Sequence, residues 1–147
     1  QLGLDLAQLH GDEPPEFLPR LGERPVMRAF RVGAEGLGPV EAYLDRCRQL
    51  DGVPRLALVD SRTKGMYGGS GMAADWSTIA RYPLHDWHPP LVLAGGLTPE
   101  NVAEAIRAVR PAAVDTASGV ESAPGRKAKA LVERFVRRAR DGFQSLS

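Results

Sequence analysis

The chain has 147 residues, 43% of them hydrophobic and 25% charged, which fits one globular domain spanning residues 1–147. Nineteen basic against 18 acidic residues give a formal net charge of +1, which argues against a nucleic-acid-binding protein. No apolar run approaches the ~20 residues of a membrane span, so no membrane partner is predicted. The single cysteine, Cys47, cannot form an internal disulfide and predicts a cytoplasmic protein.

Short apolar runs alternate with helical patterns along the whole sequence. The predicted strands are residues 5–9, 26–30, 56–60, 91–94 and 113–116, and their continuous apolar character favours burial on both faces. The predicted helices lie near residues 15–21, 43–50, 75–81, 98–110 and 131–142. Five strands, each followed by a helix, are typical of an α/β fold with a parallel sheet.

Ligands of parallel α/β folds bind at the carboxyl ends of the strands. Almost every predicted strand is followed there by a polar residue or a glycine: His10-Gly11, Asp60, Gly95-Gly96, Asp115 and Ser118-Gly119. Because these ends meet at one edge of the sheet, they predict a single site.

Two glycine turns follow the last two predicted strands. Gly95-Gly96 precedes a helix whose predicted cap is Thr98, and Ser118-Gly119 follows the final strand. Glycines at such turns let backbone N–H groups approach an anion closely, and paired turns match the phosphate site of (β/α)₈ barrels. Each glycine alone has the simpler interpretation of a tight turn.

Asp60 ends a buried strand and opens a long loop, residues 61–74, that contains four glycines. A loop that covered Asp60 would favour its protonated form, which suits a general acid. A turn or cap carboxylate is the alternative interpretation. His10 has two interpretations as well, contact with a substrate or a hydrogen bond to a neighbouring loop.

Other candidate residues have structural interpretations. His85 and His88 lack further ligands at metal-binding spacing, so no metal is predicted. Cys47 lies on the apolar face of its helix and is predicted to belong to the core. The basic residues after Gly125 are interpreted as the solvated face of the last helix.

Five stretches carry a resemblance to a known family when their order and spacing are taken together. They are Leu6-Ala-Gln-Leu-His-Gly11, Leu58-Val-Asp-Ser61, Gly68-Gly-Ser-Gly71 followed by Asp75-Trp76, Leu93 to Val102, and Val114 to Glu121. On these motifs the chain resembles the phosphoribosylanthranilate isomerases of tryptophan biosynthesis, which are (β/α)₈ barrels. The match begins at about the fourth strand of that barrel, so the expected fold is five consecutive βα units of an incomplete parallel barrel.

The resemblance implies an Amadori rearrangement of N-(5-phosphoribosyl)anthranilate to 1-(2-carboxyphenylamino)-1-deoxyribulose 5-phosphate, without cofactor or metal. It implies that Asp60 is the general acid and that His10 and Asp115 contact the substrate. It also implies two groups of glycine-rich residues: a phosphate site at Gly95, Gly96, Ser118 and Gly119, and a lid at Gly68, Gly69, Ser70 and Gly71.

The family's general base is a cysteine in a Cys-Gly motif, and this sequence contains no such motif. The chain starts at Gln1, and its three methionines are internal. We therefore expect a truncated chain that is weakly active or inactive alone. Two alternatives stay open: a non-catalytic phosphate-binding fragment that associates through its exposed strand edges, or another phosphate-binding barrel such as indole-glycerol-phosphate synthase.

Overall fold

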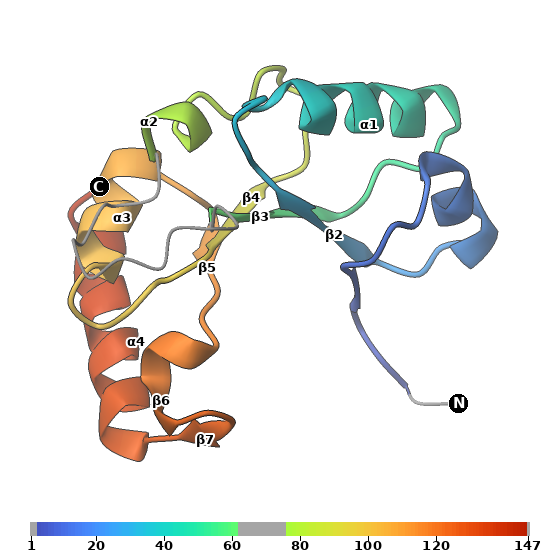
Figure 1. The fold of residues 1–147 in the computed structure, drawn as a ribbon. Coiled ribbons are helices and arrows are strands. Elements are labelled where there is room, and N and C mark those ends of the chain that lie inside the picture. Colours follow the sequence, from blue (N-terminus) through green and yellow to red (C-terminus); the bar gives the residue numbers. More distant parts are fainter. Residues whose placement is uncertain (1–2, 62–75, 147) are drawn as a thin grey trace.

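Five strands form one parallel sheet in the computed structural model, which describes residues 3–61 and 76–146. Their order in the sheet follows the chain: β1 (Ala7–Leu9), β2 (Val26–Arg31), β3 (Leu56–Asp60), β4 (Leu91–Ala94) and β5 (Ala113–Val114) (Figure 1). All five predicted strands are thus confirmed. Strand β1 begins two residues later than predicted, at Ala7, whose backbone N–H donates to the carbonyl oxygen of Pro25 just before β2 (3.0 Å).

The helices cover one side of this sheet. They are the 3₁₀ helix η1 (Pro15–Leu21) and the α-helices α1 (Gly38–Gln49), α2 (Trp76–Ile79), α3 (Val102–Val109) and α4 (Lys129–Gln144). In Figure 1, α1 and α2 lie above the strands, and α3 and α4 lie beside them. Within the described ranges, no helix is both long enough and apolar enough to cross a lipid bilayer.

Several predicted helix ends differ from the structure, and two of the differences have a local structural reason. Helix α4 continues through Gly142, where a Cβ atom would lie only 3.1 Å from Cα of Ala103. Gly142 therefore allows close approach of α3 to α4 and does not end the helix. Helix α3 starts at Val102, not next to the predicted cap Thr98, because residues 98–101 form a separate turn.

Apolar residues pack on both faces of the sheet. The larger cluster lies between the strands and the helices. It includes Leu44, Val59, Leu93 and Ile106, whose side chains are fully buried. The second cluster consists only of strand residues: buried Leu58, Val92 and Ala94, with half-buried Met27, Ala29, Leu56 and Ala113 against them. This second face carries no helix within the described ranges, so the strands are apolar on both faces as predicted.

A small antiparallel hairpin precedes α4 and is absent from the predicted elements. Its strands are β6 (Glu121–Ala123) and β7 (Arg126–Lys127), and the short 3₁₀ helix η2 (Ser118–Val120) leads into it. Pro124 and Gly125 form the turn, with Gly125 at a φ of +75°. A Pro-Gly pair is a strong turn signal, so the sequence did contain evidence for this hairpin.

Candidate active site

A pocket of about 230 Å³ lies at the carboxyl ends of the five parallel strands. Every strand, or the segment directly after it, contributes lining residues: Gln8, His10, Ala29, Phe30, Arg31, Leu58, Asp60, Ala94, Gly95, Gly96, Asp115, Thr116 and Ala117. Five of the predicted site residues are therefore brought together, although they span more than 100 positions of the sequence. They are His10, Asp60, Gly95, Gly96 and Asp115.

Asp60 and Gly95 are in direct contact at the ends of β3 and β4. A Cβ atom on Gly95 would clash with Oδ1 of Asp60 and lie 2.5 Å from the backbone nitrogen of Ser61. Gly95 also has a φ of +97°, which side-chain-bearing residues rarely adopt. The Ser61 hydroxyl donates to the carbonyl oxygens of Ala94 (3.0 Å) and Gly95 (3.1 Å), which fixes the two strand ends together.

The turn after Gly95 is organised by Thr98 and Asn101. The backbone N–H of Thr98 donates to Oδ1 of Asn101 (2.8 Å), and the N–H of Glu100 donates to Oγ1 of Thr98 (3.2 Å). Asn101 Nδ2 donates to the carbonyl oxygen of Gly96 (3.1 Å). Thr98 thus caps a turn that leads into α3, and this turn holds the glycine pair at the pocket.

The second glycine turn packs against the first. Thr116 Oγ1 donates to the carbonyl oxygen of Leu97 (2.7 Å), and a Cβ atom on Gly119 would clash with that same oxygen. Glycine is therefore required at position 119 by close backbone packing. The residues of this segment that line the pocket are Thr116 and Ala117, whereas the predicted Ser118 and Gly119 follow them in η2 without lining it.

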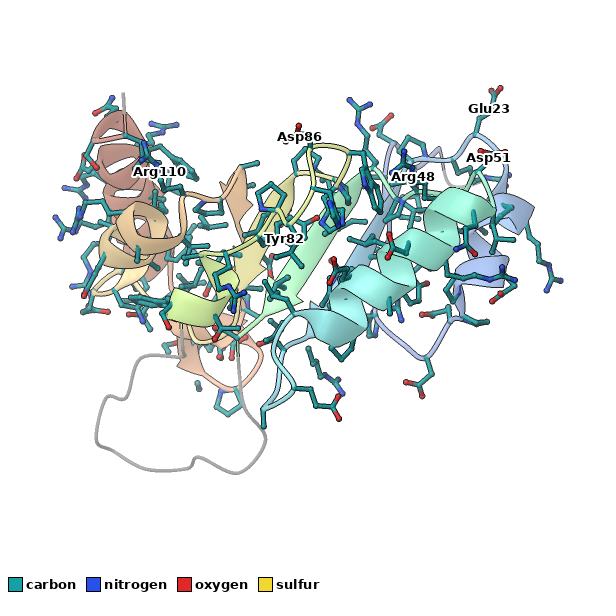
Figure 2. All side chains as sticks on the ribbon, turned by 90° about the horizontal axis from the view of Figure 1, so that it is seen from above. Glu23, Arg48, Asp51, Tyr82, Asp86 and Arg110 are labelled. Atoms are coloured by element: carbon teal, nitrogen blue, oxygen red, sulfur yellow. The ribbon has the colours of Figure 1, made fainter. Side chains whose placement is uncertain are left out.

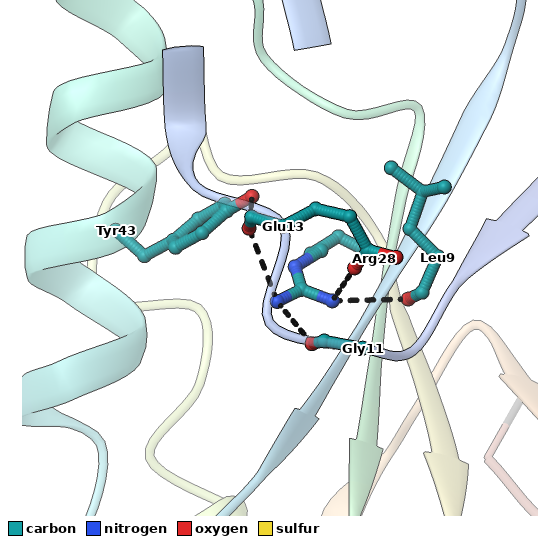
Figure 3. A network of polar contacts seen from close by, with 5 residues as sticks. All are labelled: Leu9, Gly11, Glu13, Arg28 and Tyr43. Carbon is teal, nitrogen blue, oxygen red and sulfur yellow. Dashed lines mark hydrogen bonds and ion pairs between the residues drawn. The ribbon is translucent and has the colours of Figure 1, made fainter. Parts of the chain in front are cut away.

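His10 lies just after β1, in a loop that Arg28 holds in place. Arg28 is on β2, is only 6% exposed, and donates to the carbonyl oxygens of Leu9 (3.2 Å) and Gly11 (3.0 Å) (Figure 3). It also forms an ion pair with Glu13 Oε2 at 3.1 Å. These contacts tie the backbone on both sides of His10 to the neighbouring strand.

Helix α1 completes the surroundings of Arg28. The Tyr43 hydroxyl donates to the carbonyl oxygen of Glu13 (3.0 Å), and the Arg28 guanidinium lies 5.1 Å from the centre of the Tyr43 ring. Burial raises the pKa of Tyr43, so its hydroxyl stays protonated as a donor. Arg28 was not among the residues predicted from the sequence, although a charged residue inside the apolar run 26–30 was the available signal.

Arg31 and Gln8 also line the pocket and were not among the predicted site residues. Arg31 is the last residue of β2 and pairs in register with Asp60 on β3. The available signal was its position, because an arginine directly after an apolar strand lies at the carboxyl edge of the sheet, where the other predicted site residues lie.

Two residues with candidate chemistry lie away from the pocket. Cys47 is 0% exposed within α1, and burial raises the pKa of its thiol to about 11, which confirms its prediction as a core residue. His88 is 8% exposed and packs its ring 4.4 Å from Trp87 and 5.4 Å from Tyr82. Among residues 3–61 and 76–146, no group of three or more His, Cys, Asp or Glu side chains is placed to hold a metal ion.

The loop that contains His88 connects α2 to β4 and packs near α1. Figure 2 labels Tyr82 and Asp86 in this loop and Arg48 on α1. The Arg48 guanidinium lies 4.8 Å from the centre of the Trp87 ring. The loop precedes β4, so it lies at the amino ends of the strands, opposite the pocket. The predicted lid residues Gly68, Gly69, Ser70 and Gly71 lie outside the described residues.

Comparisons with known proteins agree on one family. The family model for N-(5'-phosphoribosyl)anthranilate (PRA) isomerase matches residues 1–138. An N-(5'-phosphoribosyl)anthranilate isomerase of Geobacter sulfurreducens is 47% identical over 140 residues, covering 93% of this chain and 62% of the relative. The enzyme of Myxococcus xanthus is 49% identical over 140 residues, covering 94% and 61%.

Solved structures give the same result. The crystal structure of phosphoribosyl anthranilate isomerase from Thermotoga maritima is similar with a TM-score of 0.71 and 41% identity, covering 94% of this chain and 62% of that one. A second structure, of the isomerase in complex with reduced 1-(o-carboxyphenylamino)-1-deoxyribulose 5-phosphate, has a TM-score of 0.68 and 37% identity, covering 94% and 60%. The chain thus spans about three fifths of the length of these relatives. With an α/β fold of the (β/α)₈-barrel type, it belongs to the N-(5'-phosphoribosyl)anthranilate isomerase family.

Proposed function

We propose that this chain provides the general acid and the phosphate site of a PRA isomerase, which converts N-(5-phosphoribosyl)anthranilate to 1-(2-carboxyphenylamino)-1-deoxyribulose 5-phosphate. The observation that carries the proposal is the pocket at the strand ends, which collects His10, Asp60, Gly95, Gly96 and Asp115. The family membership supplies the reaction. A cytoplasmic location, inferred from the single cysteine, belongs to the same proposal.

Asp60 is the proposed general acid. The reaction opens the ribose ring, and a proton on the ring oxygen makes that oxygen a better leaving group from C1 as the Schiff base forms. Asp60 is half-buried at the end of β3, and its carboxylate contacts Gly95 at the beginning of the proposed phosphate site. This contact would place the acid close to the sugar that carries the phosphate.

Backbone donors of the two glycine turns form the proposed phosphate site, with Gly95, Gly96, Ser118 and Gly119 as its residues. The contacts of Thr116 and Gly119 with Leu97 support it, because they hold the two turns against each other. Gly96 is exposed, and a Cβ atom there would meet nothing within 4 Å, so an anion has room beside it. Lys127 Nζ donates to the carbonyl oxygen of Ala117 (2.7 Å) and steadies the second turn.

His10 and Asp115 are the proposed contacts to the sugar. They come from opposite edges of the sheet, because His10 follows β1 and Asp115 follows β5. Both are exposed and line the pocket, and the backbone N–H of Asp115 donates to the carbonyl oxygen of Leu93 (2.8 Å). The glycines Gly68, Gly69 and Gly71, with Ser70, are proposed as a lid that excludes water from the reaction.

The general base is the missing part of this catalytic set. The resemblance assigns the base to a cysteine in a Cys-Gly motif, and Cys47, followed by Arg48, is the only cysteine of these 147 residues. Cys47 is buried in α1 with a raised pKa, so it cannot remove a proton from sugar C2 in the pocket. We propose that the 147 residues form an incomplete barrel with little turnover alone.

Association through the sheet is a second candidate function. The apolar face formed by Leu58, Val92 and their neighbours carries no helix within the described residues, and β1 and β5 each pair with only one described strand. Unpaired strand edges favour association with a further strand. A complementing family segment or a second copy of this chain are the proposed partners.

Calorimetric titration with reduced 1-(o-carboxyphenylamino)-1-deoxyribulose 5-phosphate tests the proposed site. We expect wild type to bind this ligand and Gly95→Ala to bind it at least 10-fold more weakly. Arg55→Met is the control, because Arg55 directly precedes β3 at the opposite ends of the strands. Binding that is absent in wild type, or equal in Gly95→Ala, would show that the pocket does not serve this function.

A further inference from the structure

The His10 imidazole lines the pocket, but no side chain or backbone group in the ranges 3–61 and 76–146 holds it by a hydrogen bond or ion pair. The residue is exposed and follows β1, which pairs with β2 alone among the described strands. An exposed segment at a sheet edge is mobile unless another group fixes it. The position of the His10 ring in the pocket therefore depends on what holds its backbone.

Arg28 holds that backbone from the helix-covered face of the sheet. Alternation along β2 places Arg28 on the same face as the core residue Phe30, and Arg28 pairs in register with Leu9 at the end of β1. Two nitrogens of its guanidinium donate to the carbonyl oxygens of Leu9 and Gly11, the residues on either side of His10 (Figure 3). Arg28 is not among the described residues that line the pocket, so it acts on the backbone and not on the ligand.

Glu13 closes the loop around the same guanidinium. Its carboxylate forms the 3.1 Å ion pair with Arg28, and its carbonyl oxygen accepts from Arg28 (3.4 Å) and from the Tyr43 hydroxyl (3.0 Å). A Cβ atom on Gly11 would lie 3.0 Å from Oε1 of Glu13, so the carboxylate folds back over Gly11. Hydrogen bonds to a charged donor are stronger than neutral ones, and this donor is 6% exposed. The loop that carries His10 is thus fixed at several points by one buried side chain.

We infer that Arg28 is a positioning residue for ligand binding, which acts by holding the His10 imidazole in place at the pocket. The inference rests on the proposed function, because His10 is a proposed contact to the sugar. A contact that is already ordered loses little conformational freedom when the ligand binds. Without Arg28, His10 would still be present, but its contact with the ligand would be weakened by the cost of ordering the loop.

A double-mutant cycle measured by calorimetric titration tests the inference. The ligand is reduced 1-(o-carboxyphenylamino)-1-deoxyribulose 5-phosphate, and the proteins are wild type, His10→Ala, Arg28→Met and the double variant. If Arg28→Met is too unstable to titrate, the same cycle is measured with Arg28→Lys, which keeps the charge.

Two controls separate the role of Arg28 from general effects of charge and stability. Arg46→Met removes another arginine, whose ion pair with Glu16 is exposed. Val109→Ala leaves a cavity in the core and so lowers stability. Val109 lies in α3, which connects β4 to β5 at the other edge of the sheet from His10. Both controls should bind the ligand as wild type does.

We expect His10→Ala and Arg28→Met each to weaken binding by about 10-fold, and the double variant to be no weaker than His10→Ala alone. Arg28→Lys should weaken binding by about 3-fold, because its single nitrogen replaces two that donate to different carbonyl oxygens. This effect too should vanish when His10 is replaced by alanine.

Three results would overturn the inference. They are independent effects that multiply to about 100-fold in the double variant, an Arg28 variant that binds as tightly as wild type, and Val109→Ala binding as weakly as Arg28→Met. In each case wild type still binds, so the proposed function would stand. If His10→Ala bound as wild type does, the proposed contact of His10 with the sugar would be wrong, and the role of Arg28 with it. Failure of wild type to bind would contradict the proposed function itself.

Discussion

A side chain on Gly95 would collide with the carboxylate of Asp60, so the residue that begins the proposed phosphate site and the proposed general acid are packed against each other. The two lie on neighbouring strands, where Asp60 pairs in register with Ala94. This contact couples the position of the proposed acid to that of the proposed phosphate site. A substitution at either residue is therefore expected to displace the other.

Replacing Gly95 with alanine tests that link. Gly95→Ala introduces both the collision and a strained φ of +97°, and we expect a loss of about 3 kcal/mol in the free energy of unfolding. Gly96→Ala is the matched control, because Gly96 has a φ of +65° and open space around its Cβ position. Its expected loss is about 1 kcal/mol. Equal losses by urea denaturation would show that the contact with Asp60 is unimportant.

Gly119→Ala tests the packing between the two glycine turns. A methyl group at position 119 would be forced against the carbonyl oxygen of Leu97, and we expect a loss of about 2 kcal/mol in the free energy of unfolding. Gly33→Ala is the control, because its Cβ position is open and its φ is not strained, so it should change stability by less than about 0.5 kcal/mol. A Gly119→Ala protein as stable as Gly33→Ala would mean that the turns do not pack as described.

Arg28→Met tests the network around the His10 loop. Methionine preserves much of the packing but leaves the carbonyl oxygens of Leu9 and Gly11 without their donor, so we expect a loss of about 2–3 kcal/mol. Hydrogen exchange should also become faster in residues 10–14. The control is Arg46→Met, since Arg46 pairs with Glu16 at an exposed position and should contribute little. If both variants unfolded at the same urea concentration, Arg28 would not anchor this loop.

His88 predicts a pH dependence of stability. Burial, together with the nearby charge of His85, holds the pKa of His88 below its ordinary value, whereas Asp45 and Glu41 oppose this shift. The unfolded chain therefore binds a proton more readily, and stability falls as the pH drops through about 6.5 toward the lower folded value.

Unfolding in urea at pH 7 and pH 5 measures this effect. His88→Phe keeps a ring against Trp87 and removes both ring nitrogens, neither of which has a hydrogen-bond partner within the described residues. The variant should lose less stability than wild type between the two pH values. An identical loss in both proteins would assign the pH dependence to other groups.

The sequence predicted those parts of the site that follow from local chemistry. Asp60 and Gly95 were identifiable because a carboxylate and a glycine pair directly follow apolar strands, and the register of a parallel sheet then brings such residues together. Arg31 follows its strand in the same way, so the same reasoning applied to β2 would have included it.

Features that depend on packing between distant segments were not predictable in this way. Gly142 was predicted to end the last helix, but it lies inside α4, where the lack of a side chain lets Ala103 and Ile106 of α3 pack closely against it. No local signal distinguishes such a glycine from one that caps a helix. Arg28 is buried because the backbone oxygens of Leu9 and Gly11 fold over it, which requires the pairing of β1 with β2. Gly119 was predicted for phosphate contact, whereas the close approach of the Leu97 carbonyl oxygen explains why this position needs a glycine.

The central claim is that Asp60 of this chain acts as the acid of a PRA isomerase. The most direct measurement is the fluorescence-monitored turnover of N-(5-phosphoribosyl)anthranilate by this chain, alone and mixed with the part of the Geobacter sulfurreducens relative that it does not match. We predict little turnover alone, substantial turnover in the mixture, and a loss of about 10²–10⁴-fold when the mixture contains Asp60→Asn. Turnover that is unchanged by Asp60→Asn would contradict the claim.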